Sequence, residues 1–325
     1  MKKIFASIFV ITLLFTSCKT EEKENEVKEN TAFNQLLKDY NEGKLQLNPI
    51  NATFAGDNRF NDVFPNFLSD EYQLKSNTFF KDYKSKLAEF KNDDLTESQQ
   101  MSKAVLDWDC DMALAQASFK NDVLMPLNQM WTINLTMGQL GSGSSAQPFK
   151  TVKDYQNWLQ RLEDYNGWLH SAEARMKQGI KEGYVLPASL IKKVIPQFGG
   201  LATVENSSEG IKDFSNHLFY SPINSLPEEF TSEEKNELTK AYTNMLNNKL
   251  VPSFKKLHNL LQNEYLAAGR KDSGIDGVPQ GKEYYQHAIK NYTTTWKQAD
   301  KTLKNHFFNN QTSKENYFRK RIPEE

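Results

Sequence analysis

Cysteine and histidine are scarce in this chain of 325 residues. Its two cysteines are too few for a disulfide framework or a cysteine-rich zinc module, and its five histidines leave little material for metal chemistry. Net charge is also nearly absent, because 40 Lys and Arg residues face 41 Asp and Glu residues, for a formal charge of -1. A dedicated nucleic-acid-binding protein shows a basic face, so we predict no nucleic-acid partner.

Long apolar runs are missing as well, since no stretch reaches the ~18 consecutive apolar residues that a membrane-spanning helix needs. Hydrophobic residues make up 38% of the chain, but 12% of all residues are aromatic. That aromatic content excludes disorder over the bulk of the chain. The length corresponds to roughly two domains of about 150 residues each.

The N-terminus has the pattern of a bacterial lipoprotein signal. Met1-Lys2-Lys3 is followed by the apolar run Ile4–Phe15 and then by Thr16-Ser17-Cys18. The apolar run is too short for a stable transmembrane anchor and fits a secretory signal peptide. We predict that residues 1–17 are removed and that Cys18 is lipidated, which makes the lipid bilayer a partner. An ordinary signal peptide with an incidental cysteine is the alternative.

Residues 18–30 are charged and polar after the cysteine, which predicts a solvated, disordered tether between lipid and fold. The acidic residues directly after Cys18 resemble the surface-export tag of some Gram-negative lipoproteins. We therefore expect an outer-membrane lipoprotein, on either the periplasmic or the outward face of that membrane.

The rest of the chain is predicted to be mainly α, an extended multi-helix bundle without an internal linker over residues 31–295. Two capping boxes, Thr96–Gln99 and Thr231–Glu234, open apolar stripes with helical spacing. Pro252 should kink or interrupt the second of these helices. The residues of the first stripe, which we expect to face the core, are Met101, Val105, Trp108, Met112, Ala115 and Phe119. Further helices are expected over residues 152–183, 33–45, 70–90, 190–195, 210–218 and 283–292.

The sequence contains no complete motif for metal binding or nucleophilic catalysis. None of the histidines is followed by Glu or by a second His four positions later, so a helical zinc-peptidase site is absent. Surface or core-edge positions are expected for His170, His217, His258, His287 and His306. Asp107, Asp109 and Asp111 have calcium-loop spacing but lack the Gly and Glu that such a loop requires. They are interpreted as a solvated helix face or as salt-bridge partners. Gly141-Ser142-Gly143 lacks the Lys-Ser/Thr of a phosphate-binding loop. Cys110 is interpreted as a buried thiol.

Several segments together resemble a bacterial family known as Domain of Unknown Function 885. The matching segments are Leu47–Asp57 (LNPINATFAGD), Gln147–Leu162, Val251–Phe254 with Glu264–Leu266 and Arg270, Gly277–Gly281 (GVPQG) with Tyr284-Tyr285, and Tyr292–Thr295 (YTTT).

This resemblance implies the N-terminal part of a gluzincin-like helical metallopeptidase scaffold. Full-length members resemble zinc peptidases with an H-E-x-x-H motif, many of them secreted or lipoprotein-anchored, and their metal helix follows the TTT segment. Here the sequence departs from the family after Thr295 and ends in a divergent tail, residues 296–325, which resembles the product of a frameshift or an early stop. No metal ligand, catalytic residue or cofactor-binding residue carries over, so no cofactor is expected in this chain.

Three functions remain open from the sequence. The first is a truncated, metallopeptidase-like lipoprotein without catalysis of its own. The second is a lipoprotein that holds peptides in a groove without cleaving them, and the third is a structural helical protein of the cell envelope.

Overall fold

The computed structural model describes residues 27–130, 132–206 and 212–293, and about 70% of these residues are helical. This confirms the predicted mainly α class. The predicted signal peptide, residues 18–26 of the tether with Cys18, and the divergent tail lie outside the described residues. None of the described helices has both the length and the apolar character needed to cross a membrane.

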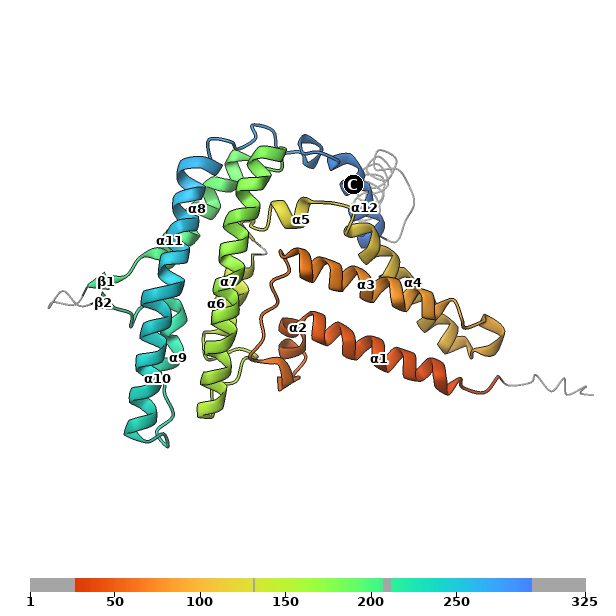
Figure 1. The fold of residues 1–325 in the computed structure, drawn as a ribbon, viewed down its shortest axis with the longest axis horizontal. Helices are drawn as coiled ribbons and strands as arrows, with labels where there is room; N and C mark the ends of the chain where they lie inside the picture. The colour runs from red at the N-terminus through yellow and green to blue at the C-terminus, as the bar shows by residue number, and fades with distance from the viewer. Residues whose placement is uncertain (1–26, 131, 207–211, 294–325) are drawn as a thin grey trace, which may run out of the picture.

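Two groups of helices make up the fold (Figure 1). The N-terminal group contains α1 (Thr31–Leu47), α3 (Asp70–Leu87) and α4 (Glu97–Gln116). In the second group, α10 (Ser232–Met245) and α11 (Val251–Leu260) pack against α7 (Val152–Glu182), and α8 (Ala188–Ala202) packs against α11. The remaining described elements are α2 (Pro49–Phe54), η1 (Asn58–Phe60), η2 (Asn92–Asp94), α5 (Asn121–Leu124), α6 (Ile133–Leu140), β1 (Glu205–Asn206), β2 (Lys212–Asp213), η3 (Leu218–Tyr220), α9 (Ser221–Asn224), η4 (Leu246–Leu250), η5 (Leu261–Tyr265), η6 (Ile275–Gly277) and α12 (Gly281–Thr293).

Caps set the helix boundaries where the sequence indicated them. The boxes that begin at Thr96 and Thr231 are both formed, and Thr151 forms a third with Asp154 at the start of α7. That helix ends at Gly183, whose φ of 82° lies in the left-handed region that glycine adopts freely. Asn48 caps α2, so the first helix ends before Pro49 as expected.

The helix predicted around Pro252 changes its hydrogen-bonding pattern before the proline but stays helical. Between α10 and α11 lies the π-helical segment η4, and Pro252 follows it in the first turn of α11, where a missing N–H costs least. The widened π turn lets the chain pass the proline ring while staying helical. A second π segment, η5, follows α11 directly.

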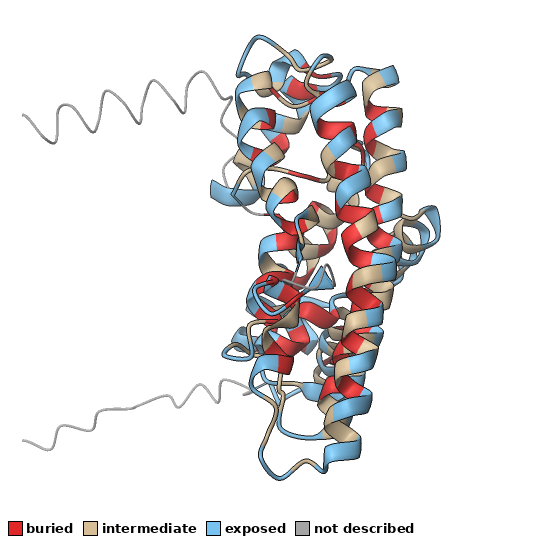
Figure 2. Cartoon of the chain, turned by 90° about the vertical axis from the view of Figure 1, so that its left-hand side faces the viewer, coloured by how far each residue is buried: buried red, intermediate tan, exposed pale blue. Residues whose placement is uncertain are grey.

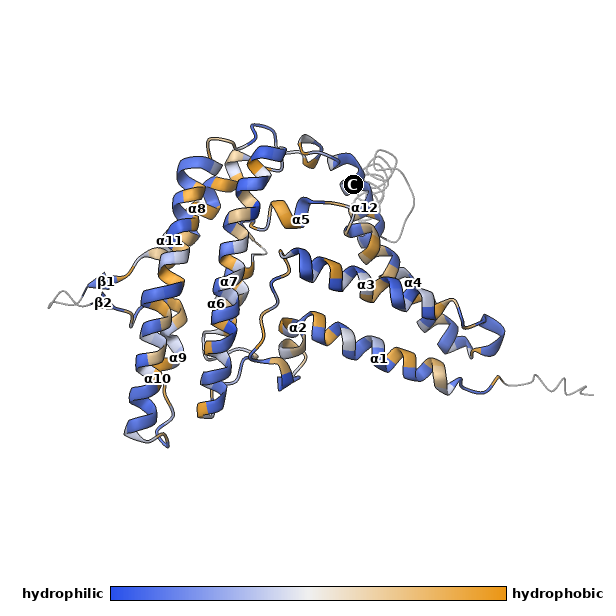
Figure 3. Ribbon diagram, in the orientation of Figure 1, coloured by the Kyte–Doolittle hydropathy of each residue, from blue (hydrophilic) through white to orange (hydrophobic). Residues whose placement is uncertain are grey.

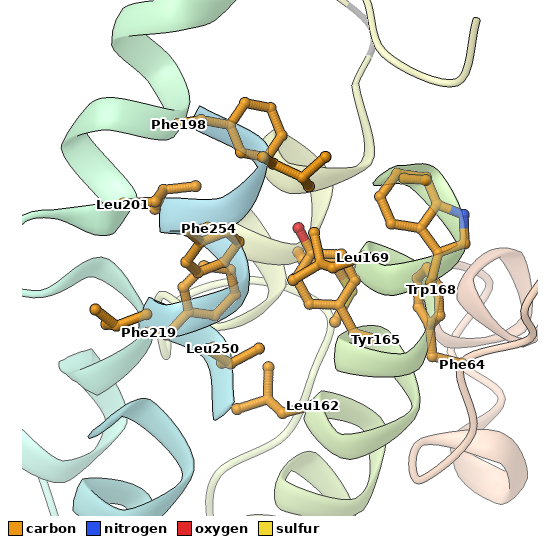
Figure 4. Packing of buried hydrophobic residues seen from close by; sticks show 14 of the residues in the cluster. Phe64, Leu162, Tyr165, Trp168, Leu169, Phe198, Leu201, Phe219, Leu250 and Phe254 are labelled. Atoms are coloured by element: carbon orange, nitrogen blue, oxygen red, sulfur yellow. The ribbon is translucent and has the colours of Figure 1, made fainter. Parts of the chain in front are cut away.

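The main core is aromatic and lies between α7, α8, α11 and η3. Tyr165 stacks on Trp168 and on Phe219, and Phe254 packs between Phe198 and Phe219 (Figure 4). Each helix of this group turns a buried stripe inward and exposed residues outward (Figure 2). The second core joins α1, α3 and α4 around Phe33, Leu87 and Leu106.

Two predictions about individual elements are wrong. Met101 and Val105 are 68% and 64% exposed, because α4 turns Leu106 and Cys110 toward α1 and α3 instead. The other face of α4 packs on α12 only farther along, near Trp108, and Phe119 contacts His287 just after the helix ends. The helix expected over residues 210–218 is absent from its described part, where residues 212–213 form β2 and pair with β1.

The apolar and polar residues alternate around most helices (Figure 3). Cys110 is confirmed as a buried free thiol, and burial raises its pKa to about 11. The three aspartates of α4 form ion pairs, as the salt-bridge interpretation predicted. Lys84 on α3 binds Asp107 at 2.9 Å and Asp111 at 2.6 Å, and Lys44 on α1 binds Asp109 at 2.6 Å.

Candidate functional site

A cavity of about 500 Å³ opens between α6, the end of α8, the β1–β2 hairpin and η3. We call it the hairpin pocket. Its volume falls within the range of small-molecule and peptide-side-chain sites. The lining residues are Asn134, Leu135, Gln197, Gly200, Leu201, Thr203, Val204, Glu205, Asp213, Asn216, His217 and Leu218.

His217 forms part of the pocket wall and is 7% exposed. Its Nδ1 accepts a hydrogen bond from the backbone N–H of Phe219 at 3.3 Å, and its Nε2 lies 3.0 Å from the carbonyl oxygen of Leu201. The first contact requires an unprotonated Nδ1, so Nε2 carries the proton and donates it to Leu201. Burial lowers the pKa of the ring, which keeps His217 neutral.

Two amide side chains bring polar atoms to the pocket. Asn134 is 1% exposed, and its Oδ1 accepts from the hydroxyl of Thr132 at 2.5 Å. Gln197 donates from Nε2 to the carbonyl of Gln129 at 3.1 Å, while its buried Oε1 has no partner among the described residues. A buried acceptor without a partner is costly, so this oxygen is a candidate ligand contact.

Carboxylates and apolar side chains frame the mouth of the pocket. Glu205 and Asp213 are paired directly across the two strands of the hairpin. The backbone N–H of Ser215, followed by its hydroxyl, holds the pKa of Asp213 below its usual range, so this group is ionised at neutral pH. Leu135 and Leu218 supply apolar surface and are 46% and 42% exposed.

A smaller cavity of about 320 Å³ lies along the opposite part of α6. Its lining includes Phe67, Met125 and Ile133, with Asp122 as its charged residue. The hairpin pocket is larger and contains the unpartnered Oε1 of Gln197, which makes it the stronger candidate.

Arg161, on α7, is fully buried and joins this helix to α2, to η1 and to the segment before α7. Its guanidinium donates to the carbonyl oxygens of Val63 and Phe60, to Oε1 of Gln147 and to the hydroxyl of Thr53, at 3.1, 2.5, 2.7 and 3.0 Å. All four acceptors are neutral. Burial lowers the pKa of Arg161 to about 10, which leaves it charged.

Comparisons with known proteins agree with this architecture. Residues 49–305 match the model of a family described as "Bacterial protein of unknown function (DUF885)". The chain belongs to the DUF885 family. The match runs past residue 295, where the sequence motifs placed the end of the resemblance. No curated protein matches the chain.

A crystal structure of a candidate lipoprotein from Colwellia psychrerythraea has a similar fold, with a TM-score of 0.65 and 16% sequence identity. The similarity covers 83% of this chain and 47% of the other. The chain thus spans about half the length of that solved structure.

The DUF885 motifs have structural roles where the structure describes them. Thr53 and Gln147, from the first two motifs, both bind Arg161. Ser253, from the third, lies between α11 and α7, where its hydroxyl contacts Oδ1 of Asn166 at 2.7 Å and Nε2 of His170 at 3.1 Å. Ser253 lines neither the hairpin pocket nor the smaller cavity, so we assign it to helix packing.

The Gly277–Gly281 motif turns the chain tightly around Arg270. The guanidinium of Arg270 donates to the carbonyl oxygens of Val185 at 2.8 Å and Gly274 at 2.6 Å, and it pairs with Asp272. A Cβ on Gly281 would lie 1.9 Å from the carbonyl oxygen of Ile275, so only glycine fits there. Thr294 and Thr295, the end of the last motif, lie outside the described residues.

The zinc that the DUF885 resemblance implies does not fit the described residues. Nowhere in the described ranges do three or more His, Cys, Asp or Glu side chains lie close enough to hold a metal ion. His170 and His217 bind the partners given above. His287 is 8% exposed and contacts Phe119, and His306 lies outside the described residues.

Sequence reasoning identified no residue of the hairpin pocket as functional. The lining comes from four elements separated along the chain, and no spacing rule connects Asn134, Gln197 and His217. The available signal was the accumulation of Asn, Gln and Gly where helical stripes end, which is too general to identify a site.

Proposed function

We propose that this protein is a lipoprotein of the cell envelope, anchored through Cys18, whose helical domain binds peptides at the hairpin pocket without hydrolysing them. The signal-like N-terminus supports the anchor, and so does the description of the similar Colwellia protein as a candidate lipoprotein. We place the protein at the outer membrane, on either its periplasmic or its surface-exposed face.

The absence of hydrolysis in this proposal rests on the sequence. Metallopeptidases of the H-E-x-x-H kind use two histidines and a glutamate on one helix to hold zinc and activate water. None of the five histidines of this chain occurs in that pattern. We therefore propose that the chain supplies the N-terminal scaffold of a metallopeptidase-like fold and not its catalytic site.

The observation that carries peptide binding is the composition of the hairpin pocket. An extended peptide offers backbone N–H and C=O groups between side chains. The unpartnered Oε1 of Gln197 can accept from such an N–H, and Leu135 and Leu218 can pack against neighbouring side chains. A purely structural envelope protein would need no such cavity.

Anchoring is tested by metabolic labelling with radioactive palmitate. We expect label on the wild-type chain and none on Cys18→Ala, while the Cys110→Ala control remains labelled because its thiol is buried. Equal labelling of the wild type and Cys18→Ala would contradict lipidation at Cys18.

Peptide binding is tested with the neutral peptide N-acetyl-Leu-Gln-Leu-amide, by calorimetric titration of the purified full chain. Thr203→Trp places an indole at the pocket wall and should abolish saturable binding, whereas Thr78→Trp, on the exposed surface of α3, should leave it unchanged. Undiminished binding to Thr203→Trp would exclude the hairpin pocket as the site. Hydrolysis of the peptide that zinc stimulates and a chelator abolishes would contradict the non-catalytic proposal.

A further inference from the structure

The hairpin pocket contains an unbalanced pair of negative charges. Glu205 and Asp213 are opposite each other on β1 and β2 and both line the pocket. Like charges directly opposite on antiparallel strands repel and destabilise the pair. Among the described residues neither carboxylate takes part in an ion pair.

The nearest cation in the sequence is committed elsewhere. Lys212 precedes Asp213 on β2, but its Nζ donates to Oδ1 of Asn247 at 2.7 Å. Glu205 accepts a hydrogen bond of 3.1 Å from Nδ2 of Asn216, and this amide group is neutral. Asp213 is held ionised by its contacts with Ser215. The pocket mouth therefore carries negative charge that a cationic ligand group would neutralise.

The interior of the pocket adds an independent polar group. Asn134 lines the cavity, and only 1% of its surface is exposed. Its Oδ1 is used by Thr132, and its Nδ2 donates to no described residue. With Oε1 of Gln197, this N–H₂ group offers one donor and one acceptor, the pair that a peptide unit requires.

We infer that the hairpin pocket selects peptides with a basic side chain next to an apolar one. The Lys or Arg side chain of the peptide lies between Glu205 and Asp213, the neighbouring apolar side chain packs on Leu135 and Leu218, and the backbone binds Asn134 and Gln197. This inference rests on the proposed peptide binding and names its ligand class. A calcium ion is disfavoured, because it takes 6–8 oxygen ligands and the pocket offers two carboxylates.

The test compares three peptides on the purified full chain by calorimetric titration. They are N-acetyl-Leu-Lys-Leu-amide, its Gln counterpart and its Glu counterpart, which differ only in the central charge. We expect the Lys peptide to bind most tightly and the Glu peptide least tightly. Each exposed charge pair contributes roughly a 1.5- to 5-fold change in affinity, so two carboxylates should give a preference of about 2- to 25-fold for Lys over Gln.

The test variant is Glu205→Gln/Asp213→Asn. The matched control is Asp82→Asn/Glu89→Gln, which removes one exposed acid within α3 and one just after it. The first should bind all three peptides with equal affinity and the control should keep the preference. Equal binding of the Lys and Gln peptides by the wild type would overturn the charge selection and leave peptide binding intact. Binding of none of them would overturn both.

Discussion

The guanidinium of Arg161 donates a 3.0 Å hydrogen bond to the hydroxyl of Thr53, which lies 108 residues earlier in the chain. Thr53 in turn lies 2.7 Å from Oδ1 of Asn61, and Gln147 binds the same guanidinium. One buried arginine thus connects α2, η1 and the segment before α7. This network fixes the position of the N-terminal helices relative to α7.

Removing Arg161 should destabilise the fold strongly. Arg161→Met leaves the carbonyls of Val63 and Phe60 without their donor, and each orphaned buried group costs about 1–3 kcal/mol. We expect a loss of roughly 3–5 kcal/mol in the free energy of unfolding. Urea denaturation measures it, with Arg59→Met as the control. Arg59 forms exposed ion pairs with Glu42 and Asp57, so its loss should cost far less than the loss of Arg161. Equal effects would contradict the buried network.

Two glycine substitutions should have opposite effects. Gly281→Ala drives a Cβ into the backbone of Ile275 and should destabilise the chain by at least about 1–3 kcal/mol. Gly167→Ala, in the exposed middle of α7, meets no atom within 4 Å and should stabilise it by about 0.5–1 kcal/mol. Thermal unfolding of the two variants checks the signs. A neutral Gly281→Ala variant would show that the turn after η6 has room to move.

The exposed end of α4 should tolerate polar substitution. Met101→Gln should change the free energy of unfolding by no more than about 0.5 kcal/mol, because the side chain is 68% exposed. Leu106→Ala, in the same helix but 4% exposed, should cost about 2–5 kcal/mol. The reverse ranking in urea denaturation would mean that α4 presents its other face to the core.

Stability should fall in mild acid, in part because of His217. Its pKa is lowered in the fold by burial, whereas the unfolded chain titrates near the ordinary value of about 6.5. The unfolded state therefore binds the proton first, and the contribution of His217 to stability, complete above about pH 6.5, is lost as the pH falls toward the lowered folded pKa. His287 contributes in the same direction.

The measurement is the difference in unfolding free energy between pH 7.5 and pH 5.5. His217→Gln should reduce this difference relative to the wild type, and His258→Gln serves as the control because its ring is more exposed than that of His217 and has no hydrogen bond within the described ranges. If both variants kept the full wild-type difference, His217 would not be a neutral buried ring.

Much of the fold could be predicted from the sequence, since helix caps and apolar periodicity are local signals. The boxes at Thr96 and Thr231 and the long stripe of α7 are of this kind. The apolar stripe predicted wrongly that Met101 and Val105 face the core. Periodicity identifies an apolar helix face but does not show whether a neighbouring helix covers its whole length. Arg161 could not be predicted as buried, because its acceptors come from segments distant in the chain.

The hairpin pocket was beyond sequence reasoning for a related reason. Residues 210–218 read as a helix, whereas residues 212–213 form β2, which pairs with β1 and places Glu205 beside Asp213. The other walls of the pocket come from α6, the end of α8 and residues 216–218. Only the tertiary fold shows that these groups share one cavity.

Equilibrium dialysis with mass spectrometry is the sharpest test of peptide binding without hydrolysis. A tryptic digest of casein is dialysed against the purified full chain, with and without added zinc, and the peptides in both compartments are quantified. We predict that intact peptides accumulate saturably on the protein side and that no new fragments form in either condition. New fragments that require zinc, or equal concentrations of every peptide on both sides, would contradict it.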